Sequence, residues 1–222
     1  MKRAKAKTDS AKDLIGVVSR ACLIAKDAAF NVGDYIANSS RIAFVAVQQC
    51  EKELDDIETQ IDQDLPSAIS EVEEQQAREL LACLKFITDL ERIGDLLCSA
   101  GNGIHHLSSP LPKEDTRQLQ AMCETLQAML EDVYQGFTHL DVTKAESALR
   151  NDVEMDRACN RVFRRHLQVP ETKAHRESAR ILLIAQALER AGDHAKNLAE
   201  EVIHLVRGKT LRHSSRTRLR QD

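Results

Sequence analysis

Apolar positions recur at helical spacing along most of the chain. Steps of three and four residues place side chains on one face of an α-helix, which has 3.6 residues per turn. Between the breaks made by proline, glycine and polar clusters, this pattern predicts six long antiparallel helices and an all-α fold. The expected ranges are 10–36, 40–72, 76–107, 114–137, 142–168 and 172–207, with Ser10 as the N-cap of the first helix.

The clearest apolar seam lies on the last expected helix. Its residues alternate steps of four and three: Ile181, Ala185, Leu188, Gly192, Ala195, Ala199, Val202 and Val206. The third expected helix repeats these steps 98 residues earlier, at Cys83, Ile87, Leu90, Gly94, Leu97, Gly101 and Ile104. The shared offset predicts an internal repeat, with two tandem three-helix bundles over 1–108 and 113–207 and a basic tail over 208–222.

Each repeat also carries acidic pairs four residues apart. LERIGD at 90–95 and LERAGD at 188–193 differ at one position, and two further pairs correspond at an offset of 101. The eight acids are Glu51, Asp55, Glu91, Asp95, Asp152, Asp156, Glu189 and Asp193. A spacing of four residues puts both members of a pair on one helix face, one turn apart.

Four neighbouring carboxylates in each repeat repel one another and need a balancing charge. Oxygen-rich clusters suit cations such as Mg, Mn, Fe or Zn, so the sequence predicts two metal sites. In the alternative interpretation, Arg92 and Arg190 balance the acids in a structural ion-pair network without metal.

The acid pairs of two antiparallel helices lie level only if the chain reverses midway between them. In the second repeat this midpoint is near 172–173, and in the first it is near 73. We therefore expect the first reversal at 73–76 and interpret Pro66 as a kink within the second helix. Gly94 and Gly192 lie between the acids on the seam, which favours close helix packing; clearance for an ion or partner is the alternative.

Composition agrees with a helical protein. Aromatic residues make up only 3% of the chain, and glycine (8) and proline (4) are rare, which disfavours β-sandwiches, barrels and doubly wound sheets. No segment resembles a signal peptide or a transmembrane helix. The six cysteines occur singly, so we expect small buried apolar residues in a protein of the reducing cytoplasm.

Charge is unevenly distributed. The net charge is −4, but residues 1–13 carry five basic and two acidic side chains, and residues 207–222 carry six basic and one acidic. The segment between them therefore has a net charge of −12. Such a body repels nucleic acid and suits cations or basic protein surfaces.

Motifs for hydrolase, nucleotide-binding or dinucleotide-binding sites are missing from the sequence, so we do not expect an enzyme. A carboxylate-bridged di-metal oxidase or metal store is one alternative, but such bundles use two Glu-x-x-His motifs and this chain has one, at Glu201 and His204. A metal-free helical adaptor is the other alternative.

These motifs resemble a known family. The segment 188–213, LERAGDHAKNLAEEVIHLVRGKTLRH, is similar to the C-terminal signature of the PhoU family, and 90–95 resembles the same signature in the first repeat. Residues 141–156 resemble the family segment that ends in the other acidic pair. The resemblance extends over about 40–207.

The resemblance implies a pair of three-helix bundles whose eight motif acids bind clusters of divalent or trivalent metal ions. It also implies a cytoplasmic negative regulator of phosphate uptake and signalling. The implied partners are a phosphate ABC transporter ATPase and a sensor histidine kinase at the inner membrane, and a homodimer is left open.

The two repeats differ just after the shared signature. The family often has Asn four residues after the aspartate of its signature; Asn197 keeps this residue, whereas Ser99 replaces it in the first repeat. We therefore expect the first metal site to be weaker than the second.

Overall fold

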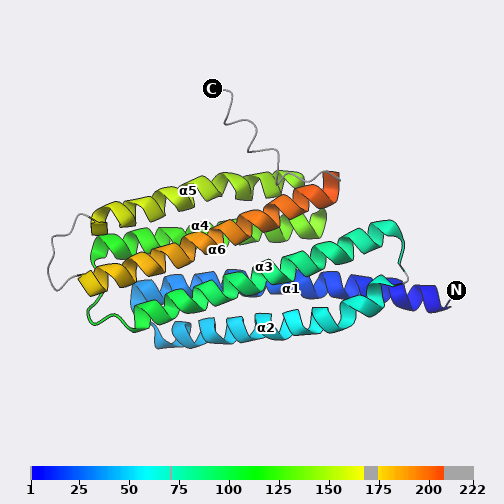
Figure 1. Cartoon of the computed structure of the whole chain (residues 1–222), viewed down its shortest axis with the longest axis horizontal. Coiled ribbons are helices and arrows are strands. Elements are labelled where there is room, and N and C mark those ends of the chain that lie inside the picture. The colour runs from blue at the N-terminus through cyan, green and yellow to red at the C-terminus, as the bar shows by residue number, and fades with distance from the viewer. Residues whose placement is uncertain (1, 71, 168–174, 208–222) are drawn as a thin grey trace, which may run out of the picture.

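The computed structural model describes residues 2–70, 72–167 and 175–207 (Figure 1). The described residues form six α-helices and no strand, which confirms the all-α prediction. The helices are α1 (Lys2–Asn38), α2 (Arg41–Ile69), α3 (Glu74–His105), α4 (Lys113–His139), α5 (Val142–Leu167) and α6 (His175–Arg207).

The helices form two three-helix units that lie side by side (Figure 1). Among the described residues, α2 contacts α1 and α3, whereas α5 contacts α4 and α6. Contacts of α1 with α4 and of α3 with α6 join the two units. The fold is therefore a duplicated bundle in which α2 and α5 are the outer helices.

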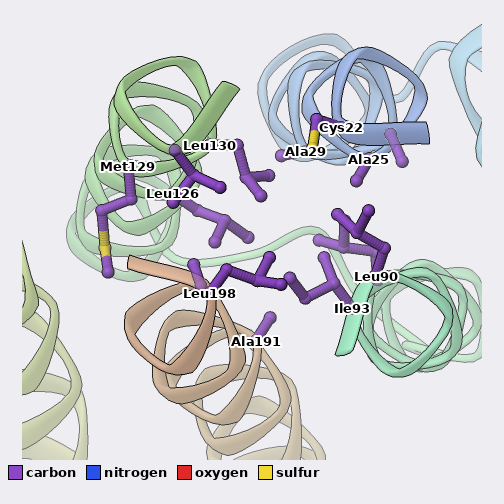
Figure 2. Packing of buried hydrophobic residues seen from close by; sticks show 14 of the residues in the cluster. Cys22, Ala25, Ala29, Leu90, Ile93, Leu126, Met129, Leu130, Ala191 and Leu198 are labelled. Atoms are coloured by element: carbon purple, nitrogen blue, oxygen red, sulfur yellow. The ribbon is translucent and has the colours of Figure 1, made fainter. Parts of the chain in front are cut away.

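One core is shared by the four inner helices. Figure 2 shows the small residues of α1, including Ala25 and Ala29, facing Leu126 and Leu130 of α4. Side chains of α3 and α6 close the other side of this core in the same view. Small side chains on α1 let α4 approach closely, so the apolar surfaces of both units are buried together.

Two helix boundaries differ from the sequence prediction. The first helix begins at Lys2, so Ser10 lies inside α1 and is not its N-cap. The segment before Gly16 is rich in Ala and Lys and lacks proline, and these residues allow a helix to extend toward the N-terminus.

The first chain reversal lies before Glu74, earlier than the expected 73–76, because α2 ends at Ile69 and α3 begins at Glu74. Pro66 lies inside α2, as predicted, and the turn comes after it. Two acids, Glu73 and Glu74, start α3, and negative charge stabilises the N-terminus of a helix. The second expected reversal, near 172–173, lies outside the described residues.

Candidate functional site

The first acid cluster lies between α2 and α3. Glu51 and Asp55 project from α2, and Glu91 and Asp95 project from α3. Burial, and then the charges of Asp55 and Asp95, raise the pKa of Glu51 above its usual value. Burial and the charge of Asp95 likewise raise the pKa of Glu91, with a contribution from Asp55. The four acids predicted for this cluster are thus close enough to repel one another.

Gly94 permits this close approach of α2 and α3. A Cβ atom at Gly94 would lie 2.8 Å from Leu54 Cδ1 and 3.6 Å from the Cα atom of Glu51. Leu54 is fully buried, so little space exists for an added methyl group. In the second repeat, a Cβ at Gly192 would lie 3.0 Å from Met155 Cγ. Both glycines therefore serve close helix packing beside the acids.

Arg92 brings a positive charge into contact with the first cluster. Its guanidinium lies 3.4 Å from Glu91 Oε2 and 3.6 Å from Asp95 Oδ2. The Arg92 side chain is 58% exposed, so solvent screens these long contacts. Cys98 lies on the same side of α3, where burial and the charge of Glu51 raise the pKa of its thiol.

The second acid cluster lies between α5 and α6. Burial raises the pKa of Glu189, and the charges of Asp193, Asp156 and Asp152 raise it further. Burial and the charges of Asp152 and Asp193 also raise the pKa of Asp156. The four acids predicted for this cluster are therefore close enough for their charges to interact.

Lys196 is a member of the second cluster that the sequence reasoning missed. Its Nζ atom donates a hydrogen bond to Asp152 Oδ2, and the Asp152 side chain is 7% exposed. Burial lowers the pKa of Lys196, but the bond to Asp152 and the nearby acids raise it overall. In the sequence, Lys196 is visible only as a lysine three residues after Asp193. This spacing is also common on solvent-exposed helix faces, so it does not by itself indicate an ion pair.

The acids of both clusters match the predicted metal sites in donor type but not in arrangement. Their carboxylate oxygens fit the donor preferences of Mg, Mn, Fe and Zn ions in chemical terms. In the described part of the chain, however, no group of three or more His, Cys, Asp or Glu side chains is arranged to hold a metal ion. Each cluster therefore supplies suitable donors, and binding would require their side chains to rotate toward a common point.

A third buried ionic group lies away from both clusters. Asp115, in the first turn of α4, is fully buried, and its Oδ1 lies 3.1 Å from His166 Nε2 and 3.5 Å from Arg165 Nε. None of the polar side-chain atoms of Asp115 and His166 makes a hydrogen bond. The sequence reasoning missed this group, because Asp115 has the pattern of an ordinary acid at a helix start.

The Glu201-x-x-His204 motif is used for contacts between helices. Glu201 Oε1 accepts a hydrogen bond of 2.8 Å from Lys85 Nζ of α3, and His204 Nδ1 lies 3.6 Å from the same oxygen. Glu201 is buried and His204 is partly exposed, as expected for a histidine at the rim. This geometry gives no support to a di-metal centre at this motif.

Most of the cysteines follow the sequence prediction. Cys22, Cys83, Cys123 and Cys159 are buried, whereas Cys50 and Cys98 are half-buried, and all six are free thiols. Burial raises the pKa of Cys22 to about 12.

Among the described residues, no helix has the length and apolar character needed to cross a membrane.

Fold and site together define a class of protein: a duplicated three-helix bundle with a cluster of four acids between the second and third helix of each repeat. The PhoU domain family matches residues 18–102 and 119–202, with one match in each repeat. This chain belongs to the PhoU family.

Curated relatives carry the same family name. The chain is 34% identical over 143 residues to "Phosphate-specific transport system accessory protein PhoU homolog 1" of Thermotoga maritima, an alignment that covers 62% of this chain and 61% of that protein. It is 32% identical over 192 residues to the PhoU homolog of Burkholderia sp, covering 79% of this chain and 78% of the relative.

Solved structures have the same fold. The crystal structure of PhoU from Pseudomonas aeruginosa has a TM-score of 0.81 at 21% identity and covers 91% of this chain and 99% of that one. The phosphate transport system regulatory protein PhoU from Streptococcus pneumoniae has a TM-score of 0.83 at 17% identity, covering 92% and 99%. At these identities the similarity establishes the fold alone.

Proposed function

We propose that this protein is a cytoplasmic accessory protein that restrains phosphate uptake and phosphate-dependent signalling. The observation that carries the proposal is the match of both repeats to the PhoU domain, together with the names of the curated relatives. The proposed partners are the ATPase of a phosphate ABC transporter and a sensor histidine kinase at the inner membrane. The protein acts by binding these partners and has no catalytic turnover of its own.

Metal binding is the second part of the proposal. Glu51, Asp55, Glu91 and Asp95 would hold an ion between α2 and α3, and Asp152, Asp156, Glu189 and Asp193 would hold one between α5 and α6. A bound divalent or trivalent cation would supply the positive charge that offsets carboxylate repulsion. The raised pKa values of Glu51, Glu91, Asp156 and Glu189 are consistent with such a role: burial is the largest cause of each, and the charges of neighbouring acids raise them further.

A metal-free helical adaptor is a second candidate for the role of the clusters. The contacts of Arg92 with Glu91 and Asp95, and of Lys196 with Asp152, favour it because they already neutralise part of each cluster. This candidate keeps the same fold and the same partners, and it differs only in what holds the acids together.

The regulatory part of the proposal is tested by deleting the gene in its host and measuring phosphate uptake and the expression of phosphate-starvation genes in high phosphate. We expect both to rise, and the wild-type gene to restore them. Unchanged uptake and expression would show that the regulatory proposal is wrong, as would oxidase activity of the purified protein with Fe and O₂.

The contribution of the acids is tested in the same strain. A variant with Glu91→Ala, Asp95→Ala, Glu189→Ala and Asp193→Ala should fail to restore repression, and it should lose metal in elemental analysis. The matched control carries Glu53→Ala and Asp56→Ala, two exposed acids of α2 outside the motif, and should behave as wild type. If the four-fold variant restores repression fully, the adaptor interpretation replaces the metal sites.

A further inference from the structure

The outer surface of α5 carries a line of arginine side chains. Arg150, Arg157, Arg161 and Arg164 follow one another at steps of seven, four and three residues, so they lie on one face of the helix. All four are exposed, and the helical rise per residue spreads them over about 21 Å. We call the surface that these four residues define the arginine face of α5.

No other helix of the described chain covers this face. α5 lies at the upper edge of the molecule in Figure 1, and its contacts with described helices are to α4 and α6. Arg157 pairs with Glu154 of its own helix, and Arg161 donates a hydrogen bond of 2.7 Å to the neutral Gln118. Arg150 and Arg164 form no ion pair with any residue that the structure describes. The face therefore keeps most of its positive charge.

The internal repeat shows that the fold does not require these arginines. At the offset of 101 residues, which relates the acids of α2 to those of α5, the four positions correspond to Gln49, Asp56, Gln60 and Gln63. These residues are exposed on α2, which is the outer helix of the first repeat. Two helices in equivalent places thus have outer faces of different charge, so their shared packing does not explain the arginines.

The composition of the face is also unusual for a helix surface that meets only water. Solvated helix faces commonly alternate the sign of charge, whereas this face sets Arg161 beside Arg157 and Arg164, at spacings where like charges repel. It does so in a chain whose segment between the basic ends has a net charge of −12. Arginine is moreover the cation that is enriched at protein interfaces, because its planar guanidinium binds a carboxylate at two points.

We propose that the arginine face of α5 binds an acidic α-helix of a protein partner. The arginines have the spacing of one helix face, so carboxylates at steps of three and four residues on a second helix would lie opposite them. Val153, which is 49% exposed between Arg150 and Arg157, would add an apolar contact. The inference rests on the proposed function, in which the protein acts by binding partners, and it assigns one such contact to a surface.

The neighbouring acid cluster limits the width of this partner. Asp156 and Asp193 of the second cluster are exposed on the side of α5 that faces α6. A flat anionic membrane or a nucleic acid duplex that covered the arginine face would bring its phosphates near these carboxylates. A helix is only about 10 Å across and can lie along the arginines alone. Charge complementarity therefore favours a protein helix over a lipid or nucleic acid surface.

The inference is tested by fluorescence anisotropy with the full chain and a labelled acidic peptide. The probe is a helical peptide of about 20 residues in an alanine background, with glutamates at steps of three and four on one face. The control peptide has the same composition, with its glutamates distributed over all faces. We expect wild type to bind the first peptide at least about tenfold more tightly than the second, and to lose this affinity at high salt.

A triple variant tests the arginine face itself. Arg150→Gln, Arg157→Gln and Arg164→Gln replace the arginines that make no hydrogen bond or ion pair to another described helix, so the fold should be kept. The affinity for the one-sided peptide should fall at least about tenfold, because the carboxylates lose three partners. Circular dichroism checks that the helices of the variant are intact.

The matched control removes the same charge from other helices. Its three substitutions are Arg20→Gln in α1, Arg41→Gln in α2 and Arg78→Gln in α3, all at exposed arginines. Arg78 pairs with Glu74 of its own helix, as Arg157 pairs with Glu154. We expect the affinity of this control for the peptide to change by less than about twofold, because these charges lie on other surfaces.

Several results would overturn the proposal. It is wrong if wild type binds neither peptide, binds both equally, or keeps its affinity when the three arginines of α5 are replaced. It is also wrong if the same substitutions abolish binding to phosphatidylglycerol vesicles, to a DNA duplex or to a second copy of this chain in sedimentation, while the peptide does not bind.

Failure of this inference can be distinguished from failure of the proposed function. If deletion of the gene leaves phosphate uptake unchanged while peptide binding depends on the three arginines, the regulatory proposal is wrong and the binding face stands. If deletion raises uptake but wild type does not bind the peptide, the binding face is wrong and the regulatory proposal stands.

Discussion

Asp115 is a fully buried carboxylate whose ionic partners come from the far end of α5. His166 and Arg165 approach it from the last turn of that helix, so the group joins the start of α4 to the end of α5. A buried ion pair adds little net stability, but removing one partner leaves an uncompensated charge in a region from which water is excluded.

We therefore expect Asp115→Ala to lower the free energy of unfolding by about 3 kcal/mol or more, because the Arg165 guanidinium loses its counter-charge and the buried His166 ring loses its polar neighbour at 3.1 Å. Chemical denaturation followed by circular dichroism measures this loss. Glu114→Ala is the matched control: Glu114 is the adjacent acid, is exposed, and binds the exposed Arg117, so its removal should leave stability nearly unchanged. Equal losses in the two variants would show that Asp115 is not a structural link.

At the scale of helices, the contact of α2 with α3 depends on a glycine. Gly94 faces the buried Leu54, and an added methyl group would overlap Leu54 Cδ1 at 2.8 Å. At an exposed helix position, replacing glycine by alanine stabilises the helix by about 1 kcal/mol, because alanine has the higher helix propensity. Insertion of a methyl group into a packed core costs about 1–3 kcal/mol, so packing outweighs the backbone term at this position.

Gly94→Ala should thus lower the melting temperature, whereas Gly16→Ala in α1 should raise it. Gly16 is exposed and has no atom within 4 Å of an added Cβ, so only the backbone gain acts there. Differential scanning calorimetry of the two variants gives the comparison. A higher melting temperature for Gly94→Ala would mean that α2 and α3 separate easily, and it would argue against close packing as the role of this glycine.

The acid clusters make the stability of the metal-free protein depend on pH. Burial and neighbouring acids raise the pKa of Glu51 and Glu91 in the folded state above the usual value of 4.5. The folded state therefore binds protons more strongly than the unfolded chain at pH values between 4.5 and the raised pKa. The contribution of these groups to the free energy of unfolding has its full value below pH 4.5, and it is lost as the pH rises through the pKa of the folded state.

Glutamine imitates the protonated form of these side chains. In EDTA at pH 7, a variant with Glu51→Gln and Glu91→Gln should melt at a higher temperature than wild type, and the difference should shrink as the pH falls toward 4.5. Glu124→Gln, at an exposed acid of α4, controls for the loss of charge and should show no such trend. A difference that grows in acid would mean that ion pairs stabilise the charged forms of Glu51 and Glu91.

At the scale of the whole molecule, the two repeats are not separate bodies. Phe86 of α3 and Phe137 of α4 lie with ring centroids 4.3 Å apart, and the inner helices bury one continuous apolar cluster (Figure 2). Neither repeat can unfold without exposing apolar surface of the other. A shared core of this kind predicts a single cooperative transition.

The chain has one tyrosine in each repeat, Tyr35 in α1 and Tyr134 in α4, and no tryptophan. Variants with Tyr35→Phe or Tyr134→Phe each retain one fluorescent reporter. In both variants, we expect the guanidinium midpoint from tyrosine fluorescence to equal the midpoint from circular dichroism. A fluorescence transition that precedes the dichroism transition in one variant would show that the repeats unfold independently.

The sequence by itself determined the elements, the duplication and the positions of the motif acids. Helical periodicity reflects backbone hydrogen bonds between residues four apart, so it can be recognised in any short window of the chain. The duplication at 98 residues locates LERIGD and LERAGD on equivalent helices, and the midpoint argument correctly assigned Pro66 to the interior of α2. Exact helix ends were less accurate, because they depend on a few residues of similar helix propensity.

Only the tertiary structure decided which charges meet and how the repeats are joined. Lys196 lies 44 residues from Asp152, and Asp115 lies 51 residues from His166, so no local pattern connects them. Arg92 and Lys196 have similar charge and similar helical spacing from the motif acids, yet one is exposed and the other contacts a buried carboxylate. This difference arises because burial depends on neighbouring helices, and the strength of an ion pair depends on that burial.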